Sequence, residues 1–229
     1  MSIIEVRDLY KIYKAGSTSV NALDGVTFNI EKGEFIAIIG PSGSGKSTLL
    51  NMLAGLESPS KGEVLIDGVH IEKLSENQLV AFRRKHVGFV FQSYNLIPTM
   101  TAVENVALPL MFRGVGKKER EEIAVKYLTL LGLGDSLRNY GNAMSGGQQQ
   151  RVGIARALAT DPPIIFADEP TGNLDTKSGA EVLQLLKNII REGEKTLIMV
   201  THSPAIANAA DRKICIVDGR ITDTLTGIV

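Results

Sequence analysis

The sequence has almost no cysteine and no excess of either charge, and each absence excludes a class of protein. Cys215 is the only cysteine among 229 residues, so no intramolecular disulfide can form. We expect a buried, inert thiol and a reducing compartment. Lys and Arg together number 25, as do Asp and Glu. This balance removes the basic surface that most nucleic-acid-binding proteins carry, so we expect no nucleic-acid partner.

Long apolar runs are also missing. No window offers the roughly 18 uncharged apolar residues of a membrane span. The N-terminal residues MSIIEVRD include acids where a signal peptide has basic residues and then an apolar run. If a membrane is involved, we therefore expect another chain to span it. The basic run RRK at 83–85 is interpreted either as a solvated helix end or as a patch that faces lipid headgroups or a partner.

The length and the 44% hydrophobic content predict one α/β body with an inserted subdomain. Residues 1–92 and 159–229 have the strand and helix pattern of an α/β core, which begins with several short strands. Residues 93–158 change character and predict a helical insertion. No repeat of the whole pattern occurs. The predicted strands are IIEV, VTFNI, EFIAIIG, KGEVLIDG, VGFVFQ, IIFADE, TLIMVTH and ICIVDG.

Two of the expected helices have clear apolar faces. The segment KKEREEIAVKYLTLLGL predicts a helix in which Ile123, Tyr127, Leu130 and Leu131 share a buried face. After the strand IIFADE, a second helix is expected to bury a stripe of five residues. These are Val182, Leu185, Leu186, Ile189 and Ile190.

The stretch GPSGSGKST at residues 40–48 predicts a phosphate-binding loop, because it follows an apolar strand and precedes a helix. Its glycines allow successive N–H groups to surround phosphate oxygens, and the helix N-terminus adds positive potential. Lys46 is expected to reach the β and γ oxygens, and Ser47 to ligate Mg²⁺. The alternative is a glycine-rich turn with a chance lysine. The other expected ATP contacts are Gly40, Ser42, Gly43, Ser44, Gly45 and Thr48.

Polar side chains close three other apolar strands, at the edge where ligands of α/β proteins bind. Asp168 is expected to hold Mg²⁺, and Glu169, which points the other way from the strand end, to deprotonate the attacking water. An exposed acidic turn is the alternative for this pair. Gln92 is expected to contact Mg²⁺ and water. His202 is expected either to contact the γ-phosphate or to cap a helix.

Two further features are candidates for nucleotide contacts. Tyr13, placed after the first strand, offers a ring face for adenine, with a place in the core as the alternative. The stretch AMSGGQQQRVGIARAL at 143–158 begins a helix with Ser145, Gly146 and Gly147, which makes a second anion site. One nucleotide does not obviously need both sites.

Together these elements resemble the ATP-binding cassette (ABC) family over essentially the whole chain. GPSGSGKS resembles the Walker A motif, Gln92 the Q-loop, MSGGQ the signature, IIFADE the Walker B motif, GNLD ending at Asp175 the D-loop, and His202 the switch histidine. Within the family, ADEPTGNLD and FQSYNLIPTMTAVENVALPL resemble cassettes of lipoprotein release, macrolide export, haem or antimicrobial-peptide efflux, and cell-division control. A few residues depart from those that the family usually has. Met144 replaces leucine, Gly141 and Ala143 replace a common proline and acid before the signature, and Ser203 replaces the aspartate that often follows the histidine.

The resemblance implies the α/β fold of ABC ATPases, a P-loop NTPase core sheet with an antiparallel β subdomain and an inserted α-helical subdomain. It also implies ATP with Mg²⁺ and a role for the second anion site. Ser145 to Gln148 would cap the γ-phosphate of ATP held by another copy, so that two chains trap two nucleotides. It also implies a separately encoded membrane permease, with this chain cytoplasmic and peripheral to the inner face of the membrane. Tyr94, Leu96, Ile97 and Pro98 are expected either to line a groove for the permease or to pack inside the insertion. The alternative function is a cassette that moves no solute and regulates a membrane partner, as in cell division.

Overall fold

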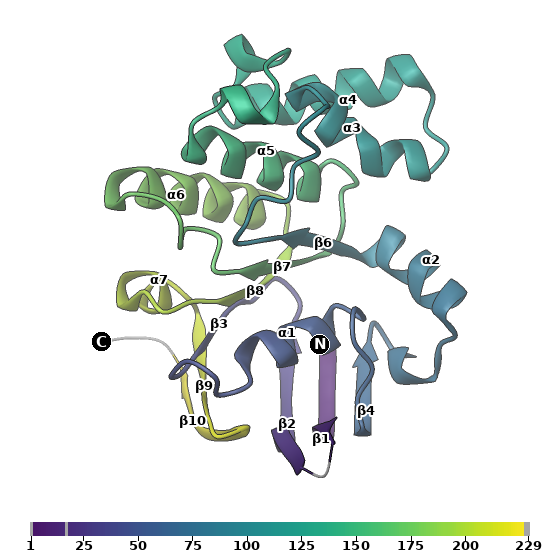
Figure 1. Ribbon diagram of the computed structural model, residues 1–229, viewed down its shortest axis with the longest axis vertical. Coiled ribbons are helices and arrows are strands. Elements are labelled where there is room, and N and C mark those ends of the chain that lie inside the picture. Colours follow the sequence, from purple (N-terminus) through teal and green to yellow (C-terminus); the bar gives the residue numbers. More distant parts are fainter. Residues whose placement is uncertain (1, 17, 227–229) are drawn as a thin grey trace. The chain divides into compact units, whose positions relative to one another are not determined.

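The computed structural model describes residues 2–16 and 18–226 and divides into two compact units (Figure 1). The first unit comprises residues 1–83 and 194–229, and the second comprises residues 84–193. The expected α/β architecture is present. In the described part of the chain, no helix combines the length and the apolar character needed to cross a membrane. The boundaries at 93 and 158 stay a prediction, and the helices expected between them all lie in the second unit.

The antiparallel β subdomain lies in the first unit and has the strand order β2-β1-β4-β5. Its strands are β1 (Ser2–Ala15), β2 (Thr18–Glu31), β4 (Lys61–Ile66) and β5 (Val69–His70). The first two are much longer than the sequence pattern predicts. They form one antiparallel ladder whose backbone pairing continues, through several register shifts, beyond the apolar segments into polar sequence.

The first unit also holds parallel strands. β3 (Phe35–Ile39) pairs in parallel with β8 (Thr196–Val200) and with β9 (Arg212–Val217). Every residue of β8 is buried, as expected for a parallel strand covered on both faces. The helices of this unit are α1 (Lys46–Leu53), a short 3₁₀ turn (Ile71–Lys73), α2 (Glu76–His86), whose last residues enter the second unit, and α7 (Pro204–Asn208).

Two predictions for the end of the chain were wrong or incomplete. Cys215 is only half-buried, because its side chain alternates along β9 with the buried Ile214 and Ile216. A further strand, β10 (Arg220–Thr226), follows β9 and pairs with it antiparallel. The residues between them, Asp218 and Gly219, both have positive φ, the geometry of a two-residue hairpin turn.

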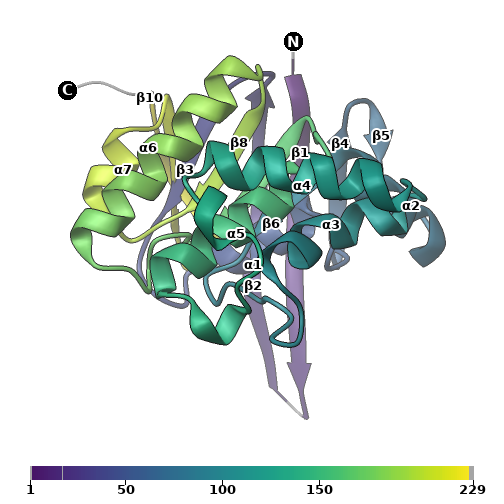
Figure 2. The ribbon, with the colours of Figure 1, turned by 90° about the horizontal axis from the view of Figure 1, so that it is seen from above.

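The second unit contains two parallel strands and four helices. β6 (Val87–Val90) pairs with β7 (Ile164–Asp168). The helices α3 (Ala102–Phe112), α4 (Lys117–Leu130) and α5 (Gly146–Leu158) pack against one another (Figures 1 and 2), and α6 (Thr176–Glu192) contacts α5. Short 3₁₀ turns lie at Gly134–Ser136 and Gly141–Ala143. On α6 the expected stripe is confirmed in part: Val182, Leu186 and Ile190 are buried, whereas Leu185 and Ile189 are only half-buried.

The face predicted for α4 was partly wrong. The helix buries Ala124 and Leu128, and Leu131 directly after it is buried too, whereas Leu130 is 50% exposed. The buried positions follow the 3.6-residue period from Ala124. A small side chain there permits close helix packing, which a pattern weighted toward large apolar residues does not reveal.

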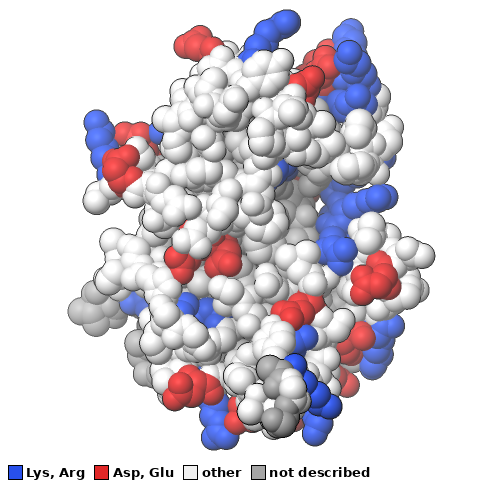
Figure 3. Space-filling view, viewed as in Figure 1, with Lys and Arg blue, Asp and Glu red and all other residues white. Residues whose placement is uncertain are grey.

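Charged side chains of both signs are interspersed on the face drawn in Figure 3, and no field of one sign covers it. The arrangement follows from the equal numbers of acidic and basic residues.

Candidate nucleotide site

The loop between β3 and α1 has a backbone that only glycine can adopt at its two ends. Gly40 has φ 146° and Gly45 has φ 102°. A Cβ on Gly40 would overlap the carbonyl oxygen of Ile216, and one on Gly45 would overlap the carbonyl oxygen of Ala22. The loop is therefore packed against its neighbours as well as tightly turned. Its other expected contact residues, Ser42, Gly43, Ser47 and Thr48, lie in the same loop or in the first turn of α1.

The polar groups of this loop fit an anion. Lys46 is only 5% exposed, and its Nζ donates to the carbonyl oxygens of Gly40 at 3.0 Å and Pro41 at 2.7 Å. The Oγ of Ser44 is buried and has no hydrogen-bond partner among the described residues. A bound phosphate would supply the missing acceptor and the negative charge that the ammonium and the N-terminus of α1 attract.

His202 and the phosphate-binding loop follow paired strands of the first unit. Ile38 of β3 lies opposite Val200 of β8, and the N–H of Thr201 donates to the carbonyl oxygen of Ile38 at 3.2 Å. Both strands run in the same direction, so the residues that follow them lie at the same sheet edge. His202 stands two residues beyond β8, and the N-cap residue of α7 is Ser203. His202 is therefore not itself the N-cap residue of α7, and its contact with the γ-phosphate stays a prediction.

Tyr13 does not follow the first strand, as the sequence suggested, but lies within β1, paired with Val20 of β2. Its side chain is not in the core, since the residue is 40% exposed. Its hydroxyl donates to the Oε1 of Glu57 at 2.7 Å. Partial burial is the largest cause that raises the pKa of Tyr13, and the bond to Glu57 raises it further.

Gln92 and Glu169 meet in the second unit, although 77 residues separate them. They follow the paired strands β6 and β7, and the Nε2 of Gln92 donates to the Oε2 of Glu169 at 3.3 Å. Asp168 is the last residue of β7. Glu169 has left the strand, with φ 43°, so simple strand alternation does not describe how the two acids diverge. A Cβ on Gly172 would lie 3.0 Å from the Nε2 of Gln92, so glycine leaves room for this contact.

The signature residues form the first turn of α5. Ser145 is its N-cap, and its Oγ accepts from the N–H of Gln148 at 3.3 Å, while the Oε1 of Gln148 accepts from the N–H of Ser145 at 2.9 Å. This capping box fixes the start of the helix. The serine hydroxyl proton can still be donated to an anion, as can N–H groups of the first turn, which includes Gly146 and Gly147.

Asp175 is the N-cap of α6. Its Oδ1 accepts from the N–H groups of Lys177 at 3.1 Å and Ser178 at 3.0 Å. The hydrogen bonds from Ser178 are the largest cause that lowers the pKa of Asp175. The carboxylate therefore has a structural role as a cap, which the sequence motif does not reveal.

Two further candidate residues, Arg156 and Asn173, were not identified from the sequence. The guanidinium of Arg156 donates to the carbonyl oxygens of Asn95 at 2.6 Å and Tyr94 at 2.8 Å, two residues with positive φ. Desolvation lowers the pKa of this half-buried group. The Nδ2 of Asn173 donates to the carbonyl oxygen of Gln92 at 3.0 Å. Nothing in the local sequence marks these contacts, because the partners lie 61 to 81 residues apart.

Two pockets open in the second unit near the segment after Gln92. One, of about 310 Å³, is lined by Tyr94, Leu96 and Pro98 as predicted, but not by Ile97. The main-chain groups of Ile97 instead bond the buried side chain of Asn105. The remaining lining residues are Ser93, Asn95, Gly141, Asn142 and Gln149.

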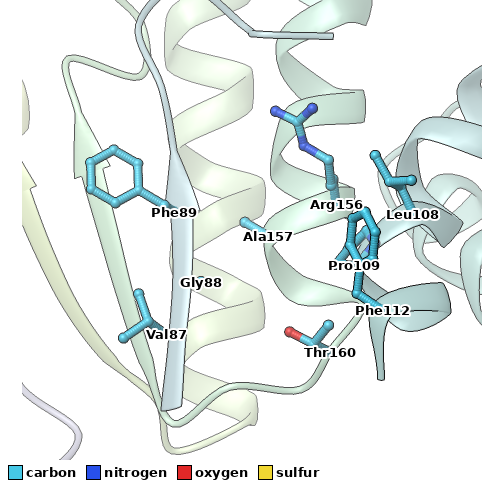
Figure 4. A pocket seen from close by; sticks show the side chains of 9 residues that line it. All are labelled: Val87, Gly88, Phe89, Leu108, Pro109, Phe112, Arg156, Ala157 and Thr160. Atoms are coloured by element: carbon cyan, nitrogen blue, oxygen red, sulfur yellow. The ribbon is translucent and has the colours of Figure 1, made fainter. Parts of the chain in front are cut away.

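The second pocket, of about 230 Å³, is drawn in Figure 4. It lies between β6 and residues of α3 and α5, and in Figure 4 the side chains of Val87 and Phe89 point to the other side of β6 from those of Pro109, Phe112 and Arg156. The lining residues are Val87, Gly88, Phe89, Leu108, Pro109, Phe112, Arg156, Ala157 and Thr160.

The predicted site residues thus form two groups, one in each unit. The loop at 40–48, Tyr13 and His202 belong to the first unit, and Gln92, Asp168, Glu169, the signature residues and Asp175 belong to the second. Among the described residues, no three His, Cys, Asp or Glu side chains cluster as a metal site. Mg²⁺ bound by the predicted ligands would need oxygen atoms of the nucleotide as further ligands, which is how Mg²⁺ is usually held beside phosphates.

Comparisons with known proteins agree with this arrangement. A family model described as "ABC transporter" matches residues 23–172. A Thermotoga maritima protein, described as an uncharacterized ABC transporter ATP-binding protein, is 52% identical over 219 residues, which are 96% of this chain and 93% of that protein. The macrolide export ATP-binding/permease protein MacB of Marinobacter nauticus is 48% identical over 221 residues, 96% of this chain but 34% of MacB.

A solved structure is similar over nearly the full length. It is the dimeric post-hydrolysis state of the ATP-binding cassette MJ0796 of Methanocaldococcus jannaschii, bound to ADP and Pi. The TM-score is 0.93 at 43% sequence identity, and the match covers 99% of each chain. The fold is thus the P-loop ABC ATPase fold with its antiparallel β subdomain and helices, and this chain belongs to the ABC transporter family as one of its ATP-binding ATPase domains.

Proposed function

We propose that two copies of this chain dimerise head-to-tail around two ATP molecules and drive a separately encoded membrane permease of an export or mechanotransmission complex. The observation that carries the proposal is that one chain has two helix starts, at Lys46 and at Ser145, whose polar groups are suited to an anion. A single bound nucleotide needs only one of them, whereas a head-to-tail pair uses both. In this assembly the chain would be cytoplasmic and held at the inner face of the membrane by the permease.

The first unit would hold the nucleotide of its own chain. Lys46 is prepared for this, because its ammonium is already directed by two loop carbonyl oxygens. Phosphate oxygens would approach the N–H groups of the glycine-rich loop and the unpaired hydroxyl of Ser44. Tyr13, with part of its ring exposed, would stack on adenine.

Of the groups proposed for hydrolysis, Gln92, Asp168 and Glu169 belong to the second unit, and Ser47 and His202 to the first. Glu169 is the proposed general base, and the hydrogen bond from Gln92 orients its carboxylate. Mg²⁺ held by Ser47, Gln92 and Asp168 would neutralise charge that builds up on the phosphate oxygens. His202 would contact the γ-phosphate.

Ser145 to Gln148 would face ATP held by the partner copy. The capping box orients the serine hydroxyl and the first N–H groups of α5, so little ordering is left for the moment of dimerisation. Asp175 begins α6 and would contribute at the same interface. The dimeric state of the MJ0796 cassette with ADP and Pi supports this proposal. ATP would join the two copies, and hydrolysis would release them.

The permease would dock on the second unit, at the pocket lined by Tyr94, Leu96 and Pro98 and at the neighbouring apolar pocket (Figure 4). Arg156 lines the second pocket and bonds the carbonyl of Tyr94 in the wall of the first. A force on this surface would thus reach α5, which begins with the signature. Macrolide export by MacB supports an export role.

Lys46→Ala should abolish Mg²⁺-dependent ATP hydrolysis and weaken nucleotide binding, because it removes the phosphate-directed charge. Glu169→Gln should slow hydrolysis by roughly 10²- to 10⁴-fold, about 3 to 5 kcal/mol of barrier, while it spares Asp168. Size-exclusion chromatography of Glu169→Gln should then show a dimer with ATP and a monomer without nucleotide. A mutant that stays monomeric with saturating ATP would contradict the proposed dimer.

Mixing two inactive variants tests whether the signature acts on the partner's nucleotide. Lys46→Ala damages the phosphate-binding loop, and Ser145→Arg places bulk and charge where the γ-phosphate should meet α5. A mixed head-to-tail dimer contains one site with an intact loop from one chain and an intact signature from the other. Light scattering should therefore detect an ATP-dependent heterodimer that neither variant forms alone. If the signature acts within its own chain, every site in the mixture is defective and no dimer appears.

A further inference from the structure

A small cluster of polar residues surrounds Tyr13 in the first unit. The Tyr13 hydroxyl donates to the Oε1 of Glu57 at 2.7 Å, and the hydroxyl of Thr48 is a second hydrogen-bond partner. Thr48 lies in the first turn of α1, and Glu57 lies in the segment between α1 and β4. The far end of the tyrosine ring is therefore anchored to the helix that follows the phosphate-binding loop and to the segment beyond it.

Lys11 completes the cluster from the same strand as Tyr13. Its Nζ lies 3.3 Å from the Oε1 of Glu57 and 5.2 Å from the centroid of the Tyr13 ring, over the ring. The same Nζ donates to the carbonyl oxygen of Ser58 at 2.7 Å. The Lys11 and Glu57 side chains are only 14% and 27% exposed. An ammonium in this position covers one ring face, so only the opposite face is available for stacking.

We propose that Glu57 is a positioning residue for nucleotide binding, which holds the Tyr13 ring, with Lys11 against one face, so that the opposite face receives a purine base. The inference rests on the proposed role of Tyr13 as the base-stacking residue. It adds that the ring is held in place before the nucleotide arrives. A tyrosine that rotates freely would have to be ordered on binding, which weakens affinity by about two- to ten-fold.

The comparison of Glu57→Ala with Glu57→Gln in the full chain tests this role. Both variants remove the negative charge, but only glutamine keeps an oxygen that can accept from the Tyr13 hydroxyl. Isothermal titration should show ADP binding about two- to ten-fold weaker for alanine than for glutamine. Inorganic tripolyphosphate, which has no base, should bind both variants equally. Glu63→Ala, which changes a half-buried glutamate of neighbouring β4, should match the wild type for both probes.

A second set of variants separates this role from a structural one. Tyr13→Phe keeps the ring and loses the hydroxyl, so Glu57→Ala and Glu57→Gln should bind ADP equally in that background. If tripolyphosphate binding falls in parallel with ADP binding in Glu57→Ala, the residue acts on the whole loop and the inference is wrong. Tyr13→Ala tests the underlying proposal. If Tyr13→Ala binds ADP as tightly as the wild type, the stacking role of Tyr13 is wrong. If Tyr13→Ala binds ADP more weakly while Glu57→Ala and Glu57→Gln bind ADP equally, only the role of Glu57 is wrong.

Discussion

Asn105, on α3, is 1% exposed and holds the segment that leads from the pocket after Gln92 into that helix. Its Oδ1 accepts from the N–H of Ile97 at 2.8 Å. Its Nδ2 lies within hydrogen-bond distance of the carbonyl oxygens of Ile97 at 3.2 Å, Met100 at 3.1 Å and Thr101 at 3.0 Å. One side chain thus bonds main-chain groups of residues 97, 100 and 101, in the segment that leads into the helix.

Asn105→Ala removes all of these contacts at once. The Nδ2 has two hydrogens for three carbonyl oxygens, so with the bond to Oδ1 the side chain makes at most three full hydrogen bonds, and at about 0.5 to 1.5 kcal/mol for each bond they amount to about 1.5 to 4.5 kcal/mol. The carbonyl oxygens of Ile97 and Thr101 keep donors in the N–H groups of Met100 and residue 105, which keeps the loss near the middle of this range, at about 3 kcal/mol. For a chain of this size, about 3 kcal/mol corresponds to a fall in Tm of roughly 6 to 12 °C.

Differential scanning calorimetry of the nucleotide-free chain measures this shift. Asn188→Ala is the matched control, because Asn188 is an exposed residue of α6 whose side chain accepts one bond, from Gln184. Its Tm should change by less than about 2 °C, as expected for an exposed position. Asn105→Asp keeps the acceptor but turns a carboxylate toward carbonyl oxygens, so it should be at least as unstable as the alanine variant at neutral pH. Equal Tm values for Asn105→Ala and the control would refute the reasoning.

Three further predictions concern separate parts of the chain. The hydrogen bonds from the side chain and the N–H of Ser178 lower the folded pKa of Asp175 below its ordinary 3.8. Its stabilisation of α6 is therefore complete at neutral pH and disappears as the pH falls from about 3.8 through the folded value. NMR titration should show this loss, with Asp175→Asn, which does not titrate, as control. Gly45→Ala should lower Tm more than Gly43→Ala, since both positions have positive φ but only at Gly45 would a Cβ overlap a carbonyl oxygen; equal losses would contradict this packing. The lysine of Arg156→Lys cannot reproduce the paired bonds to the carbonyl oxygens of Asn95 and Tyr94. Hydrogen exchange of the amides in residues 93–98 should therefore accelerate, while exchange in the rest of the second unit stays unchanged.

The sequence by itself determined the local elements and the chemistry of the motifs. Each depends on neighbours along the chain: glycines that permit the loop before Lys46, a serine with glutamine three residues later that caps α5, and buried runs such as residues 196–200. The main helices and parallel strands were predictable for this reason. The family resemblance rested on the same short motifs.

The tertiary structure alone decided which distant residues meet. Gln92 reaches Glu169, Arg156 reaches the carbonyl of Tyr94, and Tyr13 is held by Glu57, across 44 to 77 residues of sequence. It also decided which face of a mixed helix is buried, as the exposed Leu130 shows. Local patterns report backbone geometry and apolarity, whereas hydrogen-bond partners and buried faces depend on what the folded chain places opposite each side chain.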